Sequence, residues 1–90
     1  MLVYLSKQQK LIEVIRVEYF EDDHQYDEHI QLQLTDVDDD EESVLTIDED
    51  DLRENKKALR NAGFRSNSLE TLIEDIVDKI LKHGKVVIPI

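Results

Sequence analysis

The feature that most constrains the fold is an amphipathic stretch near the end of the chain. Its apolar side chains recur every three or four residues, which places them on one face of an α-helix. They are Leu69, Leu72, Ile73, Ile76, Val77, Ile80 and Leu81. Asn67 and Glu70 are suited to cap the start of this helix, and Gly84 is suited to end it. An apolar face of this length requires a second layer of structure to cover it.

Short segments rich in β-branched and aromatic residues supply that second layer. We expect strands over 1–5, 11–20, 30–34, 43–47 and 85–90. Residues 30–34 alternate strictly between apolar and polar side chains, as a half-buried strand does. Pro89 has no N–H to donate to a sheet, so the last strand is expected at an edge.

In the strand expected over 11–20, apolar and polar side chains alternate less regularly than in the strand over 30–34. In a strand, Leu11, Ile15, Val17 and Tyr19 would share one face, which Glu13 interrupts. The alternative is a helix that begins with a capping box of Ser6 and Gln9. We favour the strand because β-branched and aromatic residues predominate in this segment.

A further helix is expected over 48–62. Asp48 is suited to cap it, the acidic residues that follow favour the positive end of its dipole, and Gly63 is suited to end it. Its apolar stripe is formed by Leu52, Leu59 and Ala62. Its basic residues share one face, at Arg53, Lys56, Lys57 and Arg60. We expect these basic side chains to pair with the protein's own acidic loops; the alternative is that they contact an acidic partner.

The order of strands, two helices and a final strand predicts one α+β domain over residues 1–90. The expected architecture is an antiparallel β-meander of three or four strands packed against two helices, with a short C-terminal edge strand.

Charge is distributed very unevenly along the chain. The net charge is −11, and residues 21–51 contain fifteen acidic residues without a lysine or arginine. Such clustering costs stability through self-repulsion. One interpretation is that these acids only solvate the protein, and the other is that they bind a basic partner. The candidate partner-binding residues are Asp22, Asp23, Asp27, Glu28, Asp36, Asp38, Asp39, Asp40, Glu41 and Glu42.

No catalytic, cofactor or metal site is expected. The chain has no cysteine and two glycines, which excludes thiol chemistry and a glycine-rich phosphate loop. Asp38, Asp40, Glu42 and Glu49 match positions of a calcium-binding loop, but Ser43 stands where its turn needs glycine. His24 and His29 lie among acidic residues, but their spacing is not one that is typical of metal ligands. The acidic outer face of the 69–81 helix argues against binding to DNA.

The acidic middle segment therefore suggests a non-enzymatic binding protein that blocks a basic, nucleic-acid-binding surface of another protein by imitating DNA phosphates. In size, acidity and lack of cysteine the chain resembles small phage-encoded inhibitors of host defence nucleases; this resemblance is one of composition. The alternatives are an immunity or antitoxin protein that neutralises a basic toxin, and a structural or adaptor subunit that assembles, as a homodimer or with a partner, through the C-terminal strand.

The expected location is the cytoplasm. A secreted domain of this size usually needs disulfides, and the first residues lack the basic start and cleavage site of a signal peptide. The longest apolar run, residues 86–90, is far shorter than a membrane span, and the negative charge disfavours anionic lipid.

Overall fold

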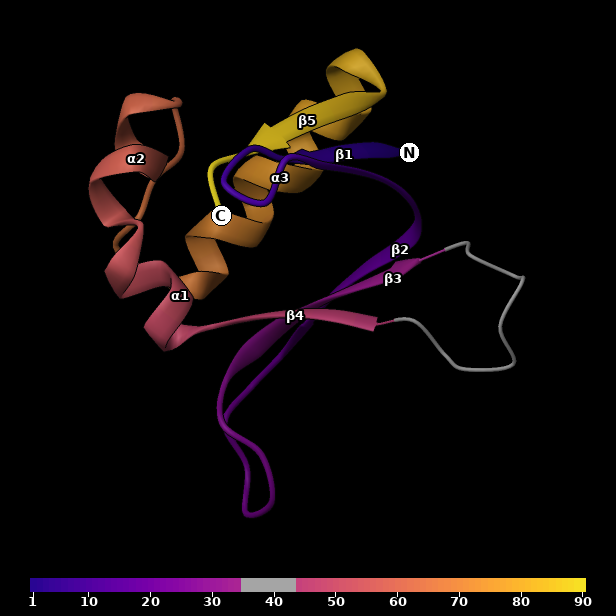
Figure 1. Ribbon diagram of the computed structural model, residues 1–90. Helices are drawn as coiled ribbons and strands as arrows, with labels where there is room; N and C mark the ends of the chain where they lie inside the picture. Colours follow the sequence, from indigo (N-terminus) through magenta and orange to yellow (C-terminus); the bar gives the residue numbers. More distant parts are fainter. Residues whose placement is uncertain (35–43) are drawn as a thin grey trace.

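A computed structural model describes residues 1–34 and 44–90 (Figure 1). Its elements are β1 (Leu2–Leu5), β2 (Lys10–Phe20), β3 (His29–Leu34), β4 (Val44–Asp48), α1 (Glu49–Glu54), α2 (Lys56–Asn61), α3 (Leu69–His83) and β5 (Lys85–Ile88). The strands form one sheet in the order β4-β3-β2-β1-β5, and α3 packs against β2, β3 and β5. The predicted α+β class is confirmed.

The sheet is mixed, which the prediction of a simple meander missed. Strands β1 to β4 pair in antiparallel order, as expected of a meander. Strand β5 lies at an edge, as predicted, but it runs parallel to β1, with Leu2 opposite Lys85. A parallel neighbour requires a long crossover, and the chain makes it through the helices between β4 and β5.

Strand β2 contains a register shift that changes which side chains are buried. Leu11 and Ile15, predicted to face the core, are 64% and 56% exposed, whereas Ile12 and Val14 are buried. The pairing with β3 is irregular between Val14 and Arg16. One extra residue in a strand moves every later side chain to the opposite face of the sheet. Val17 therefore faces the core, as predicted.

The helix predicted over 48–62 is interrupted at Asn55, so residues 1–34 and 44–90 contain three helices instead of the predicted two. The buried Asn55 side chain donates to the Asp51 carbonyl at 2.7 Å and accepts a hydrogen bond from the Lys7 ammonium. An asparagine that bonds to nearby backbone in this way competes with the helical pattern. The predicted Asp48 cap is confirmed, as a capping box with Asp51, and Gly63 follows α2 with φ +89°.

Helix α3 is the main support of the core. Leu69, Leu72, Ile76 and Ile80 are buried beneath it, whereas Leu81, predicted to share their face, is 80% exposed. Gly84 adopts the left-handed conformation and ends the helix as predicted.

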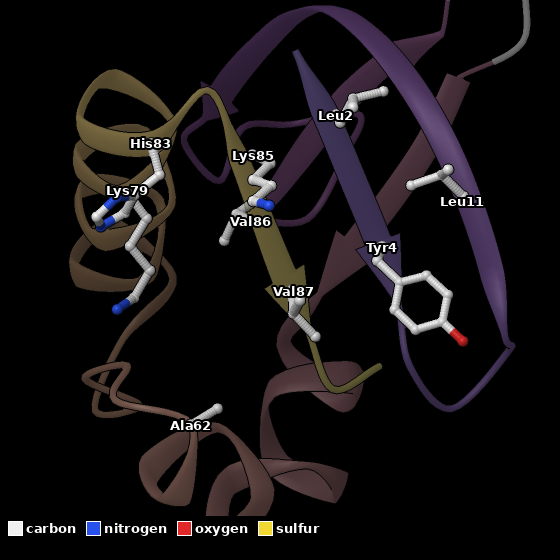
Figure 2. Close-up of a pocket in the computed structure, with 9 residues that line it drawn as sticks. All are labelled: Leu2, Tyr4, Leu11, Ala62, Lys79, His83, Lys85, Val86 and Val87. Carbon is white, nitrogen blue, oxygen red and sulfur yellow. The ribbon is translucent and has the colours of Figure 1, made fainter.

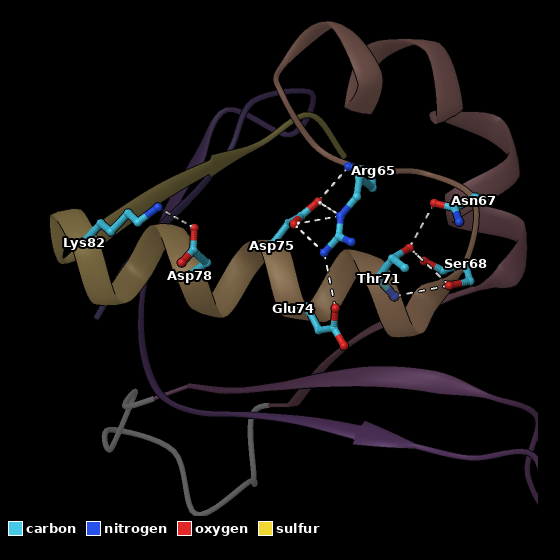
Figure 3. Close-up of polar contacts among 8 residues, drawn as sticks. All are labelled: Arg65, Asn67, Ser68, Thr71, Glu74, Asp75, Asp78 and Lys82. Atoms are coloured by element: carbon cyan, nitrogen blue, oxygen red, sulfur yellow. Dashed lines mark hydrogen bonds and ion pairs between the residues drawn. The ribbon is translucent and has the colours of Figure 1, made fainter.

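The start of α3 differs by one residue from the prediction. Ser68 is the cap and accepts from the Thr71 N–H at 3.2 Å, while Asn67 accepts from the Thr71 hydroxyl (Figure 3). The preceding loop is held by Arg65, whose backbone N–H and guanidinium both donate to Asp75. Partial burial of the Asp75 carboxyl raises its pKa, but the bonds from Arg65 outweigh this and hold the pKa of Asp75 below its usual value.

Candidate functional site

An acidic cavity forms where the β2–β3 hairpin meets the start of α1. The pairing of β3 with β4 sets His29 opposite Asp48, which brings the hairpin connection, residues 21–28, beside the first turn of α1. The cavity has a volume of about 480 Å³. It is lined by Asp22, Asp27, Glu28, Asp48, Glu49, Asp50 and Arg53. Six carboxylates from two separate segments thus line the cavity together with one guanidinium, that of Arg53.

Glu28 and Glu49 bring the hairpin and α1 carboxyls together at this cavity. The pKa of Glu49 is raised, first by hydrogen bonding with Glu28, then by desolvation and by repulsion from Glu28; Arg53 acts in the opposite direction. Glu28 also accepts a hydrogen bond from the Tyr19 hydroxyl, and this bond raises the pKa of Tyr19. Two carboxylates close together repel each other, which disfavours ionisation. A bound cation would reduce this repulsion between Glu28 and Glu49.

Arg53 is the cation that the protein itself supplies to the cavity. Its guanidinium pairs with Asp50 at 3.3 Å, and both side chains are largely exposed. The expected pairing of the basic face with the protein's own acids is thus seen for Arg53; among the described residues, Lys56, Lys57 and Arg60 form no ion pair. The helix break at Asn55 separates Arg53 from Lys56, Lys57 and Arg60, so these four do not lie on one continuous helix face.

The predicted partner-binding residues fall into three groups. Asp22, Asp27 and Glu28 line the acidic cavity. Asp23 instead holds the hairpin turn: its carboxylate accepts from the backbone N–H groups of Tyr26, at 2.7 Å, and Gln25, at 2.8 Å. These bonds hold the pKa of Asp23 below its usual value. The rest lie outside the described residues, namely Asp36, Asp38, Asp39, Asp40, Glu41 and Glu42.

Sequence reasoning missed the contribution of α1 to this site. Asp48, Glu49 and Asp50 are predicted to act at the start of the helix and are not among the predicted partner-binding residues, yet their side chains line the cavity. Asp48 performs both roles, because it also caps α1. The sequence does contain a signal for these residues, because the excess of acids continues without a break up to residue 51. Their position beside the hairpin depends on the β3–β4 register, which is a property of the tertiary structure.

His29 has a structural role at the end of the hairpin. Its ring stacks on Phe20 with centroids 5.0 Å apart, and its Nδ1 lies 2.7 Å from the Asp27 carbonyl oxygen. His24 is exposed in the turn. Within residues 1–34 and 44–90, no group of three or more His, Asp or Glu side chains has the arrangement of a metal site. The calcium-loop pattern from Asp38 to Glu49 lies partly outside these ranges.

Comparison with known protein families, with curated proteins and with solved structures found no match. In the part of the chain that the structure describes, no helix combines the length and the apolar character needed to cross a membrane.

Proposed function

We propose that the protein binds and blocks a basic surface of another protein through the acidic cavity. The observation that supports this proposal is the convergence of hairpin and α1 carboxylates around one space. Carboxylates bind guanidinium groups through short, charge-assisted and often bidentate hydrogen bonds. An arginine or lysine of the partner would therefore compete with Arg53 for Asp50 and reduce the repulsion between Glu28 and Glu49.

The partner surface that fits best is one that normally binds nucleic acid. Such surfaces carry clustered arginine and lysine residues that neutralise phosphates, and this chain presents clustered carboxylates with a net charge of −11. In this proposal the protein acts as a DNA mimic that inhibits a nuclease or another nucleic-acid-binding enzyme, as a phage anti-defence protein would. Its association would be fast at low salt and weakened at high salt.

A hexa-arginine peptide labelled with a fluorophore provides a direct test of the cavity. We expect the double variant Asp22→Asn, Asp27→Asn to bind it about fivefold more weakly than the unchanged protein. The matched control is Glu54→Gln, Glu70→Gln, which makes the same change in net charge at exposed positions outside the cavity. Equal affinities of the two double variants would contradict the proposal, because binding would then depend on net charge alone.

Competition with nucleic acid separates the DNA mimic from the alternative of an immunity or antitoxin protein. Once a basic partner has been captured, duplex or single-stranded nucleic acid should displace the mimic from it. An immunity protein that covers a different basic surface would stay bound, and that outcome would favour the alternative.

A further inference from the structure

A second surface, distinct from the acidic cavity, lies along the open edge of β5. The Leu2 N–H donates to the Gly84 carbonyl at 3.2 Å, and the Ser6 N–H donates to the Ile88 carbonyl at 3.0 Å. In a parallel ladder, alternate residues of a strand bond to the same neighbour. Lys85 and Val87 therefore direct their N–H and C=O groups away from β1, at an edge where the described residues place no further strand.

An apolar groove of about 360 Å³ follows this edge on both sides (Figure 2). On the sheet side it is lined by Leu2, Tyr4 and Val87, which the register places close together: Tyr4 lies opposite Val87, and Leu2 opposite Lys85. On the helix side it is lined by Ala62 and by side chains of α3. A segment added to the edge would thus bury its side chains on both faces.

The groove is bordered by basic side chains, in contrast to the acidic cavity. Lys79 and His83 extend from α3 on one side, and Lys85 extends from β5 itself (Figure 2). Lys79 lies 5.1 Å from the ring centre of Phe64. Among the described residues, none of these three forms an ion pair, whereas the neighbouring Lys82 pairs with Asp78. The charge of the groove is therefore complementary to carboxylates.

We propose that the β5 edge binds an extended segment of a partner protein in which apolar and acidic residues alternate. The segment would exchange main-chain hydrogen bonds with Lys85 and Val87, as in other cases of strand addition. Because side chains alternate along a strand, its apolar residues would cover Val87 and Tyr4 while its acidic residues face Lys79 and His83.

A second copy of this chain fits the edge less well than such a segment. Pairing two β5 strands about a two-fold axis would bring the same three basic side chains of each copy to one interface. We therefore favour an acidic partner segment over self-association.

The test uses a capped octapeptide of alternating valine and glutamate, titrated into the full chain and followed by backbone amide NMR. We expect the largest shifts at the amides of Lys85 and Val87. A peptide with lysine in place of glutamate should bind at least about fivefold more weakly. A glutamate peptide that is N-methylated at alternate residues should not bind, because it cannot donate to the edge.

The protein variants are Lys79→Gln, on the side of the groove that the acidic residues would face, and its matched control Lys56→Gln, which lies on α2 outside the groove. Lys79→Gln should weaken binding of the glutamate peptide by about fivefold, and Lys56→Gln should leave it nearly unchanged. Three outcomes would overturn the proposal: no shift at Lys85 and Val87 with millimolar peptide, equal affinity for the lysine peptide, or a dimer in light scattering whose Val87 amide is protected without any peptide.

Discussion

Glu49 shows how a single side chain can experience opposing electrostatic effects within the fold. It begins α1, where the dipole favours its negative charge, yet its contact with Glu28 raises its pKa. The folded protein therefore binds a proton at Glu49 more readily than the unfolded chain does. Such local destabilisation is common at binding sites, where a ligand removes its cause.

Glu49→Gln should therefore make the protein more stable at neutral pH. A group whose pKa is raised in the folded state favours folding at pH values below its ordinary pKa, and loses that effect as the pH rises through the raised value. The variant should gain stability over the unchanged protein as the pH rises from the ordinary value of 4.5. Urea denaturation at pH 4 and pH 7 measures this; a variant that is less stable at pH 7 would contradict the assigned contact.

At the scale of the elements, α3 combines one buried and one exposed apolar row. Leu69, Leu72, Ile76 and Ile80 pack on the sheet, while Val77 and Leu81 remain exposed. Burial of the first row is the principal contribution of the helix to stability, and the caps at Ser68 and Gly84 fix where the helix begins and ends.

Ile76→Ala should lower the free energy of unfolding by about 2–5 kcal/mol, because it leaves a cavity under a fully buried side chain. Leu81→Ala is the control on the same helix and should change stability by less than about 0.5 kcal/mol. Chemical denaturation of both variants measures the difference. Similar values for the two would show that α3 packs through a different face.

Most elements could be predicted from the sequence because each depends on local periodicity and end signals. The strands and α3 belong to this class. The bulge near Ile15 could not, because it depends on the pairing with β3. The break at Asn55 has a local cause, the bond of its side chain to the Asp51 carbonyl, but the contact with Lys7 that accompanies it is distant in sequence. The hairpin half of the acidic cavity was predicted from composition, whereas the α1 half depends on the β3–β4 register.

At the scale of the whole molecule, acidic and basic side chains gather on different surfaces. The hairpin and the start of α1 carry the acids, and the β5 edge with the adjacent part of α3 carries bases without ion pairs among the described residues. The two proposed surfaces thus differ in the charge of the partner they attract. The acidic excess still dominates and opposes folding through self-repulsion.

Salt should therefore raise the stability of this protein. An increase from about 0.01 M to about 0.5 M sodium chloride shortens the screening length several-fold and weakens repulsion among the acids. We expect a higher melting temperature at high salt, and a smaller salt effect in a variant that neutralises Asp22, Asp27, Glu49 and Asp50. A melting temperature that falls with salt would show that attractive ion pairs outweigh the repulsion.

The parallel pairing of β1 with β5 also has a consequence for how the protein folds during synthesis. The contact joins the beginning of the chain to its last strand, and contacts of such high sequence separation slow folding. On the ribosome, β2, β3 and β4 are complete while β1 still lacks its outer neighbour. β1 gains this neighbour only after β5 has been synthesised, so until then β1 is an unpaired edge that is exposed to misassembly.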